Sequence, residues 1–468
     1  MKHLVVGATL LLAVSLGVPN AAGAPRAPNI VFILADDLGW TDLGVQGSKY
    51  YESPNIDRLA AEGMRLTNHH HCQNCTPTRA ALMSGQYAPR TGVYTVGGIG
   101  RFNWQIRPLR PVLKGAGYAT AIFGKWHLGQ KDEYHPGRRG FDEALVTAGG
   151  HFDFVVQPKV AYPPGVYLAD WLTDQSVDFI RRHKDRPFFL YLSHFAVHSP
   201  YEAKPELVEK FKPKAGVGGH NNPTYAAMIF SVDQSVGRVL AVLEELKLAD
   251  NTVVVFSSDN GGVGGYAREG IVNAGHVTDH LPLRSGKGSL YEGGTRVPLI
   301  VRWPGVTPPG STCDVPTIHV DLYPTFLQIA GAAAPAGYPL DGESLVPLLR
   351  QSGTLRREAI YHHFPGYLGA GQNTWRTTPV GVITVGDWKL MEFFEDGRLE
   401  LYNLRDDLSE QVNLAGKNPE KTKELHEKLV AWRASVRAPM PTPHTPDTTL
   451  PPKEAKKKPR AKQAKRAR

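Results

Sequence analysis

Four short apolar runs in the sequence each end in side chains that can bind ions or transfer protons. The runs span residues 29–35, 118–123, 187–192 and 252–256. The polar residues that follow them are, in the same order, Asp36 and Asp37, Lys125 and His127, His194 and His198, and Asp259 and Asn260. Continuous apolar runs of this length are typical of strands buried on both faces of a parallel sheet. Open α/β sheets bind ligands beyond the carboxyl ends of their strands, so we expect all four groups to meet at one edge of one sheet.

Two of these groups offer oxygen atoms to a cation. Asp36 and Asp37 follow one buried strand, and Asp259 and Asn260 follow another. Three carboxylates close together are costly to bury unless a cation neutralises them. All-oxygen ligation favours Ca²⁺ or Mg²⁺ over zinc or copper. The pattern therefore predicts a hard divalent cation at the sheet edge, and the alternative is that the carboxylates only cap helices.

A cysteine stands at the start of a predicted helix that ends at Gly85. Thr76 can cap this helix and Pro77 suits its first turn, which places Cys75 just outside the helix N-terminus. The partial positive charge there favours anionic chemistry, and Arg79 reaches the same end. Taken alone, the same pattern also fits a structural cysteine or a thiol of low pKa.

Residues 75–85 resemble the signature of the formylglycine-dependent, type I sulfatases, which is Cys-x-Pro-x-Arg with a trailing helix. Other segments are similar to motifs of that family in the family's order: residues 35–39, 124–129, 139–142, 198–200, 258–262, 286–288, 291–294 and 401–407. The resemblance covers residues 26–435. It implies an alkaline phosphatase-like α/β fold, in which a large, mixed, mostly parallel sheet is flanked by helices.

The resemblance also implies the chemistry. Cys75 would be converted to formylglycine by a formylglycine-generating enzyme and would complete the shell of one Ca²⁺ with Asp36, Asp37, Asp259 and Asn260. One hydroxyl of the hydrated aldehyde would attack the sulfur of a sulfate ester, and collapse of the second hydroxyl would expel sulfate. The implied roles are these: Arg79 and His127 hold and deprotonate the second hydroxyl, Lys125 and Lys287 bind sulfate oxygens, and His198 protonates the leaving oxygen.

Polar residues between the motifs are candidates for the substrate pocket: Arg101, His151, Asp153, His276, Asp279 and His280. Such a set suits a sugar better than a flat aromatic ring, because hydroxyls need paired donors and acceptors. We therefore expect a sulfated polysaccharide or glycosaminoglycan fragment as substrate. Two alternatives remain open: a phosphate mono- or diester hydrolase of the same superfamily, and a non-catalytic binder of sulfated glycans.

Other patterns near Cys75 carry less weight. Residues 69–72 with Cys75 resemble a soft-metal or thiol redox cluster. Residues 74–76 match a glycosylation sequon, but a glycan there would block the site. Cys72 and Cys313 could pair, which the sequence does not decide. We expect His194 to pack beside its strand.

Helical patterns over residues 56–63, 170–183 and 225–246 separate the strands and complete an α/β pattern. After Leu349 the pattern changes to short strands over residues 360–363, 381–384, 388–391 and 399–402, with a closing helix over 421–437. This predicts a smaller C-terminal α+β domain with a short antiparallel sheet. The predicted organisation is a signal peptide (1–24), a catalytic domain (25–349), the α+β subdomain (350–440) and a tail (441–468).

The two ends of the chain differ from its body. Lys2, an apolar run over residues 4–18 and small residues at 21–24 are typical of a secretory signal peptide, which predicts export to the periplasm or the extracellular space. An uncleaved anchor is the alternative, and no later stretch is expected to span a membrane. The net charge of +9 lies mostly in residues 453–468, which hold nine Lys or Arg and one Glu. The body is nearly neutral, so nucleic acid is not an expected partner, and the tail, predicted to be disordered, suits solubility or loose attachment to polyanions.

Overall fold

The computed structural model describes residues 26–96, 109–271, 277–371 and 374–442. The predicted signal peptide (1–24), most of the predicted tail, Arg101 and His276 lie outside the described residues.

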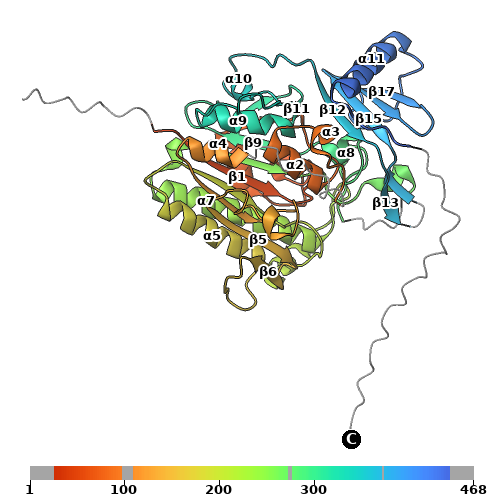
Figure 1. Ribbon diagram of the computed structural model, residues 1–468. Coiled ribbons are helices and arrows are strands. Elements are labelled where there is room, and N and C mark those ends of the chain that lie inside the picture. Colours follow the sequence, from red (N-terminus) through yellow and green to blue (C-terminus); the bar gives the residue numbers. More distant parts are fainter. Residues whose placement is uncertain (1–25, 97–108, 272–276, 372–373, 443–468) are drawn as a thin grey trace, which may run out of the picture.

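A nine-stranded sheet forms the centre of the fold (Figure 1). Its strands, in spatial order, are β10 (Ser311–Cys313), β2 (Met64–Leu66), β9 (Leu299–Arg302), β8 (Thr252–Ser258), β1 (Asn29–Ala35), β7 (Phe188–Ser193), β4 (Ala119–Gly124), β5 (Glu143–Gly149) and β6 (Phe154–Gln157). The central strands β8, β1, β7, β4 and β5 run parallel, whereas β9 and β6 run antiparallel to their neighbours β8 and β5. The sheet is therefore mixed and mostly parallel, which confirms the predicted fold class.

The predicted apolar runs coincide with the four central strands β1, β4, β7 and β8 to within two residues. Every residue of these strands is buried. Side chains of β1 alternate between two hydrophobic cores: Val31 and Ile33 belong to one and Ile30 and Phe32 to the other. Burial on both faces is what the uninterrupted apolar runs predict.

Helices cover both faces of the sheet (Figure 1). The core on one face is completed by α1 (Pro54–Glu62), α5 (Leu168–Arg182), α6 (Pro205–Phe211) and α7 (Pro223–Glu245). The core on the other face is completed by α2 (Cys75–Ser84), α4 (Leu109–Gly115), α9 (Leu322–Ile329) and α10 (Val346–Leu349). Short elements between them are α3 (Ala88–Thr91), α8 (Glu292–Thr295), η1 (Gly44–Gln46), η3 (Asp132–Tyr134), η4 (Ala249–Asn251), η5 (Tyr266–Glu269) and η6 (His319–Asp321), and β3 (His69–His70) pairs with β11 (Thr317–Ile318).

Helix α7 is long and apolar enough to cross a membrane by length and composition. The expectation that no stretch after the N-terminus reaches that threshold is therefore wrong. In the structure 72% of the apolar window of α7 is buried within the protein, where the helix packs against α5, α6 and α1. Its hydropathy is accounted for by its place in the core.

A second, smaller sheet lies toward the C-terminus (Figure 1). It is antiparallel, in the order β12 (Ala359–Phe364), β15 (Val380–Val385), β16 (Trp388–Phe393) and β17 (Leu399–Asn403), and α11 (Pro419–Ser435) packs on it through Leu425 and Leu429. A hairpin of β13 (Leu368–Gly371) and β14 (Thr374–Thr377) stands between β12 and β15 in the chain. Leu290 and Tyr291 share a core with this sheet, so the boundary after residue 349 stays a prediction.

Candidate functional site

The register of the central strands aligns their carboxyl ends. Ala35 of β1 pairs with Ser258 of β8. Ser193 of β7 pairs with Leu34 of β1 and with Gly124 of β4. The residues that follow these ends therefore lie next to one another, and the prediction that the polar groups meet at one sheet edge is confirmed.

The turn after β4 depends on a glycine. Gly124 has φ 114°, and a Cβ there would lie 1.8 Å from the carbonyl oxygen of Ser193. The backbone N–H of Lys125 donates to that same oxygen at 2.8 Å. Because any side chain at position 124 would collide with β7, glycine lets β4 deliver Lys125 directly to the sheet edge.

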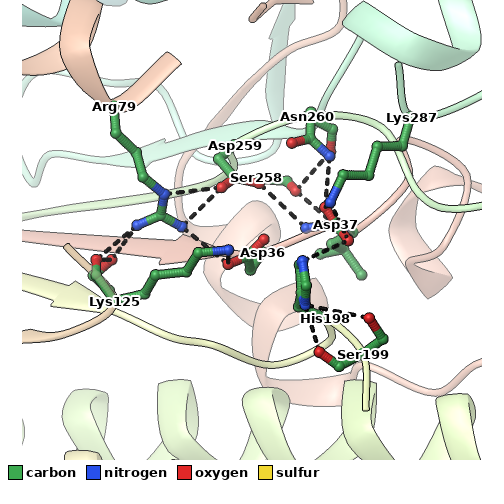
Figure 2. A network of polar contacts seen from close by, with 12 residues as sticks. Asp36, Asp37, Arg79, Lys125, His198, Ser199, Ser258, Asp259, Asn260 and Lys287 are labelled. Atoms are coloured by element: carbon green, nitrogen blue, oxygen red, sulfur yellow. Dashed lines mark hydrogen bonds and ion pairs between the residues drawn. The ribbon is translucent and has the colours of Figure 1, made fainter. Parts of the chain in front are cut away.

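Figure 2 shows the buried carboxylates that gather there. The donor atoms of Asp36, Asp37, Cys75 and His198 all lie within 4.8 Å of one another. The backbone N–H of Asp37 donates to Asp259 Oδ1 at 3.2 Å. Asn260 Nδ2 donates to Asp37 Oδ1 at 2.8 Å, which turns the amide oxygen of Asn260 away from Asp37. The five predicted ligands therefore lie in one contact network, which His198 joins.

Two buried oxygens in this network fit a cation. Among the described residues, Asp36 Oδ1 and Asn260 Oδ1 have no hydrogen-bond partner, although both side chains are 0% exposed. An unpartnered buried acceptor costs about 1–3 kcal/mol. A hard cation bound by carboxylate and amide oxygens would remove that cost, and the donor set suits Ca²⁺ or Mg²⁺.

Three side-chain cations face the three carboxylates (Figure 2). Lys125 Nζ forms an ion pair with Asp36, and Lys287 Nζ lies 2.7 Å from the Asp37 carboxylate. Arg79 Nη2 lies 2.8 Å from Asp259 Oδ2 and 3.3 Å from Asp36 Oδ2. The charge of the carboxylates is thus balanced within the chain. Charge balance alone therefore does not require a metal ion, and the separate observation that favours one is the pair of unpartnered oxygens.

The ionisation of the carboxylates differs within the cluster. Burial raises the pKa of Asp259 to about 6, and repulsion from Asp36 adds to the rise. Burial also opposes ionisation of Asp36, but Lys125, His198 and Arg79 outweigh it and hold the pKa of Asp36 below its usual range. The Asp37 pKa is lowered too, because Lys287 and His198 outweigh its burial. Asp36 and Asp37 are therefore ionised at neutral pH.

Helix α2 begins two residues earlier than expected. Asn74 has an extended backbone (φ −154°, ψ 175°) and is the N-cap, so Cys75 is the first helical residue and Thr76 is not the cap. Gly85, with φ 67°, ends the helix as predicted. Burial raises the pKa of the Cys75 thiol to about 12. Such a thiol stays protonated at neutral pH, which argues against the alternative of a low-pKa thiolate.

Arg79 is 1% exposed and is surrounded by acceptors. Besides Asp259 and Asp36, its guanidinium donates to Ser193 Oγ at 2.6 Å and to the Lys125 carbonyl at 2.8 Å. It therefore fixes the strand ends of β4, β7 and β8 relative to α2. Its predicted contact with a hydroxyl at position 75 stays a prediction.

Two histidines complete the site. His127 has φ 57°, a strained value for a residue other than glycine, and its Nδ1 is buried without a hydrogen-bond partner in the described part of the chain. Burial, with Lys125 and Arg79, lowers the pKa of His127 to about 3, so the ring is neutral. His198 is 24% exposed at its side chain, and its Nε2 lies 3.7 Å from Asp37 Oδ2. His198 is thus the more open of the two rings.

The predicted substrate residues that the structure describes differ in burial and in their contacts. His151 is buried, and its Nε2 forms a hydrogen bond with the backbone carbonyl of His198 at 2.9 Å, so His151 holds the backbone of His198 in place. Asp153 is exposed. Asp279 accepts from the backbone N–H of His280, and the His280 ring is 0% exposed with Nε2 at the carbonyl of Gly262. Both residues thus make contacts within their own loops, and the assignment of Asp279 and His280 to a substrate pocket stays a prediction.

The patterns that carried less weight have structural explanations. His69 Nε2 lies 2.9 Å from His71 Nε2, but in the described residues these side chains and Cys72 do not belong to any group of three or more donors close enough to hold an ion. Cys72, Cys75 and Cys313 are all free. His194 is fully buried and bonds through Nε2 to Ser235 Oγ at 3.0 Å, which confirms its packing role.

Three residues near the site were not predicted. Tyr266 donates its hydroxyl to the Lys287 carbonyl at 2.8 Å, and the Arg376 guanidinium lies 5.0 Å from the Tyr266 ring centre. Tyr201 follows His198 closely, and Asp37 and Lys287 both influence its pKa. Arg376 and Tyr266 lie outside the recognised motifs, so no local signal identifies them; only the position of Tyr201 just after residues 198–200 could have done so.

Comparison with known families decides the assignment. The Sulfatase family model matches residues 28–332. The model described as N-sulphoglucosamine sulphohydrolase, C-terminal, matches residues 286–435. The chain belongs to the sulfatase family. It is a sulfuric ester hydrolase, as predicted.

Relatives cover most of this sulfatase. It is 36% identical over 516 residues to a sulfatase of Formosa agariphila, covering 89% of this chain and 90% of that one. It is 35% identical over 382 residues to N-acetylgalactosamine-6-sulfatase of Homo sapiens, covering 73% and 70%. It is similar to the crystal structure of Ps i-CgsB in complex with k-i-k-neocarrahexaose, with TM-score 0.76, 30% identity and coverage of 87% and 93%. A phosphonate monoester hydrolase of Agrobacterium radiobacter, at 20% identity and TM-score 0.68, shares the fold.

Proposed function

We propose that this sulfatase removes sulfate from a sulfated polysaccharide or glycosaminoglycan fragment, with a formylglycine made from Cys75 as nucleophile and one Ca²⁺ as cofactor. The observation that carries the proposal is the cluster at the sheet edge, where donor atoms of Asp36, Asp37, Cys75 and His198 lie within 4.8 Å of one another. The unpartnered oxygens of Asp36 and Asn260 support the cation.

The residues present fit both groups. Asp36, Asp37, Asp259, Asn260 and the oxygen of a formylglycine at position 75 would hold the cation. When bound, the cation lowers the pKa of a hydroxyl on the aldehyde hydrate, so that this oxygen can act as a nucleophile at neutral pH. The unmodified thiol does not offer this chemistry, since burial raises its pKa to about 12.

The two lysines are suited to bind the sulfate group. Lys125 and Lys287 keep their charges because the neighbouring carboxylates Asp36 and Asp37 raise their pKa values against the effect of burial. Once a divalent cation shares those carboxylates, the cluster has an excess of positive charge. That excess favours an anionic sulfate ester and stabilises the charge that develops as the S–O bond breaks.

The two histidines are suited to move protons. His127 is neutral at physiological pH, so it can accept a proton from a hydroxyl at position 75. His198 is held through Nδ1, which lies 2.5 Å from the Ser199 carbonyl and therefore carries the proton. In the imidazolium form its Nε2 faces the cluster and can protonate a leaving alkoxide oxygen.

The role of His198 is testable, because its Nε2 also lies within the group of donors that could hold a cation. His198→Ala should slow the hydrolysis of sulfate esters with poor alkoxide leaving groups about 100- to 10,000-fold and slow activated aryl sulfates far less. Equal losses on both would remove its role as general acid. A raised Ca²⁺ requirement with equal losses would make it a ligand instead.

Sugars are supported as substrates by two kinds of observation. The relatives include an N-acetylgalactosamine-6-sulfatase, and the similar crystal structure contains a carrahexaose. Steryl-sulfatase of Rattus norvegicus is also 34% identical, so the alternative of a sterol sulfate belongs in the test. We further propose export directed by residues 1–24, maturation by a formylglycine-generating enzyme, and loose attachment of residues 453–468 to polyanions.

The decisive experiment combines mass spectrometry with a substrate screen. Protein secreted by its native host should start near residue 25 and carry the mass of formylglycine in the peptide that contains residue 75. The same protein should release sulfate from defined sulfated oligosaccharides faster than from steryl or aryl sulfates, and faster than phosphate from matched phosphate esters. An unmodified thiol with glycan binding but no turnover would favour the non-catalytic alternative, and dominant phosphate release would favour the phosphoesterase.

A further inference from the structure

Two side chains that would act on the sulfate ester share an aromatic neighbour. Lys125 follows β4 and His198 follows β7, and both point toward the buried carboxylates at the sheet edge (Figure 2). The Nζ of Lys125 lies 5.4 Å from the centre of the Phe195 ring. The His198 ring centre lies 5.0 Å from the same point, with the two ring planes inclined by 30°. Phe195 thus contacts both the ammonium and the imidazole, which come from different strands.

These contacts are of a kind that fixes orientation. A cation over an aromatic face gains about 0.5–2 kcal/mol, and a pair of aromatic rings gains about 0.5–1.5 kcal/mol beyond the burial of its surface. Phe195 is half-buried and packs against one of the two hydrophobic cores of the large sheet. Because its ring is held by the core, Phe195 can keep Lys125 and His198 at a constant separation.

Phe195 and His198 are the first and last residues of one turn. The backbone N–H of His198 donates to the Phe195 carbonyl at 3.0 Å. Two further backbone hydrogen bonds join the turn to the end of β1. The N–H of Asp36 donates to the Ala196 carbonyl at 3.0 Å, and the N–H of Val197 donates to the Asp36 carbonyl at 2.8 Å. The turn is therefore tied directly to a predicted ligand of the cation.

His151 holds the same turn from the loop between β5 and β6. Its Nε2 lies 2.9 Å from the His198 carbonyl oxygen, and since a carbonyl only accepts, Nε2 is the donor. The His151 ring is stacked with Phe195 at 4.9 Å between ring centres and with Tyr167 at 5.8 Å. The rings of Tyr167, His151 and Phe195 thus form a series of contacts that leads to His198 and Lys125.

Glu202 joins two members of this series. Its Oε2 accepts from the His151 backbone N–H at 2.9 Å, and its carbonyl accepts from the Tyr167 hydroxyl at 3.0 Å. His151 is 0% exposed. An effect of His151 on the reaction therefore passes through the residues that it holds, of which His198 is the one that faces the cluster.

We propose that Phe195 and His151 are positioning residues of the reaction. Phe195 fixes the Lys125 ammonium and the His198 imidazole relative to each other, and His151 fixes the turn that carries Phe195 and His198. The inference rests on the proposed function, in which Lys125 binds a sulfate oxygen while His198 protonates the leaving oxygen. Both oxygens belong to one ester group, and a displacement of about 1 Å can lower the rate about 100-fold.

Replacement of His151 separates positioning from general stability. His151→Leu removes the hydrogen bond to the His198 carbonyl and should lower kcat for sugar sulfates about 10- to 100-fold, with KM within about twofold. Hydrolysis of 4-nitrophenyl sulfate, whose leaving group needs little protonation, should change less than about threefold. His151→Gln can keep the donor and should recover most of the loss. The matched control is His363→Leu, because His363 is also buried and bonds through Nε2 to a carbonyl, that of Pro439. It should leave the ratio of the two kcat values unchanged.

A double-mutant cycle shows whether His151 acts through His198. In a His198→Ala background, His151→Leu should change kcat for the sugar sulfate by less than about twofold, because the side chain that it positions is absent. The same loss in both backgrounds would mean that His151 only supports the fold and would overturn its positioning role. Equal losses of His151→Leu on sugar and aryl sulfates, or no loss on either, would overturn it as well.

Phe195 supplies a second test that does not depend on the folding of the His151 variants. Phe195→Leu keeps an apolar side chain without a ring. It should lower kcat for both substrates about 10-fold, because Lys125 serves every sulfate ester, and should affect the sugar sulfate more, because His198 is displaced as well. Phe195→Tyr keeps the ring and should retain most of the activity. Normal kcat values in Phe195→Leu, or equal losses in both variants, would overturn the role of the ring.

Failure of the proposed function would look different. If His198→Ala slows sugar and aryl sulfates equally, His198 is not the general acid, while the cycle still reports whether its effect depends on His151. A protein that hydrolyses no sulfate ester would refute the proposed function altogether. Crystal structures of the parent protein and of His151→Leu would then test the positioning role without turnover, since His198 should move in the variant, and an unmoved ring would overturn the inference.

Discussion

This sulfatase buries two clusters of opposite charges, and the oxygen atoms of the two clusters differ in their contacts. The sheet-edge cluster consists of Asp36, Asp37, Asp259, Arg79, Lys125 and Lys287. The internal cluster consists of Glu292 of α8, Arg296, Lys389 of β16 and Glu410. Both clusters are buried, and both hold acidic side chains between cations. Their difference lies in how completely each acidic oxygen is used.

In the internal cluster every carboxylate oxygen lies close to a donor, although Glu292 Oε2 and Glu410 Oε1 make no hydrogen bond within the described residues. Lys389 Nζ lies 2.9 Å from Glu292 Oε1 and 2.8 Å from Glu410 Oε1. Arg296 Nε lies 3.2 Å from Glu292 Oε2, and Glu410 Oε2 accepts from the Glu292 backbone N–H at 2.8 Å. These contacts join the small sheet to α8. The internal cluster is therefore structural.

The sheet-edge cluster keeps Asp36 Oδ1 and Asn260 Oδ1 without partners, and it lies beside the partly open His198. Equal charge balance in the two clusters shows that burial of charge does not by itself identify a catalytic centre. Oxygens without a hydrogen bond occur in both clusters, so the more specific sign is that those of the sheet edge lie at strand ends beside the partly open His198, where a ligand can reach them.

The largest expected effect belongs to the nucleophile of the sheet-edge cluster. Cys75→Ala removes the precursor of formylglycine and should lower the turnover of sulfate esters at least about 10,000-fold, as for the loss of other covalent nucleophiles. The thermal midpoint should change little, because the substitution removes one sulfur atom. Sulfate release and thermal unfolding are the measurements.

Cys313→Ala in β10 is the matched control, since Cys313 is free and lies on the outermost strand of the large sheet. It should keep wild-type turnover. Retained turnover in Cys75→Ala would refute the assignment of the nucleophile. It would also refute the conclusion that the sheet-edge cluster is the catalytic one.

The second effect belongs to the internal cluster. Lys389→Met leaves Glu292 and Glu410 buried without their shared cation and should lower the free energy of unfolding by about 3–5 kcal/mol. Denaturant titration with and without Ca²⁺ measures it, and the stabilisation by Ca²⁺ should match that of wild type. Lys428→Met, at a surface ion pair, should leave stability unchanged. A Lys389→Met protein of normal stability, or one that has lost its response to Ca²⁺, would contradict a purely structural cluster.

How much of the two clusters the sequence predicts depends on how far apart in the chain the contacting residues lie. The four central strands and their polar ends are local patterns, so their existence and their meeting at one edge were predicted. The segment 75–79 and its ordered companions predicted the family. The start of α2 was misjudged by two residues, because Asn74 adopts an extended backbone that nothing in the sequence requires.

The sequence did not predict contacts between segments that lie far apart in the chain. The link between Arg376 and Gly288 joins segments 88 residues apart, and Lys389 reaches Glu292 across 97 residues. The local contacts of Asp279 and His280, with the His280 backbone and with the Gly262 carbonyl, were not predicted either. The role of a polar side chain in a loop depends on which partner the fold brings to it.

The third effect concerns the unused oxygens. Saturating Ca²⁺ should stabilise the wild-type protein by about 2.7 kcal/mol at 100 times the dissociation constant, and chelation should remove both this gain and the activity. Asp36→Asn should lose most of the Ca²⁺-dependent shift in thermal midpoint, because one charged ligand is gone. Asp341→Asn, which alters a carboxylate bound to Arg90 away from the cluster, should keep the shift. An Asp36→Asn protein with an unaltered Ca²⁺ response would show that the unpartnered oxygens are not ligands.

The smallest effect is a pH dependence of the internal cluster. Burial, with repulsion from Glu292, raises the pKa of Glu410 to about 7, against 4.5 for an exposed glutamate. The folded state therefore holds the proton more tightly than the unfolded state. The stability gained from this proton is complete below about pH 4.5 and is lost as the pH rises through about 7.

Glu410→Gln removes this titration, since glutamine keeps the shape of the protonated acid. Between pH 4.5 and 8, the free energy of unfolding of wild type should fall relative to that of Glu410→Gln by up to about 3 kcal/mol. Denaturant titrations of both proteins across this range, with Ca²⁺ constant, measure the difference. Parallel curves would contradict the raised pKa and would mean that Lys389 keeps Glu410 ionised at all these pH values.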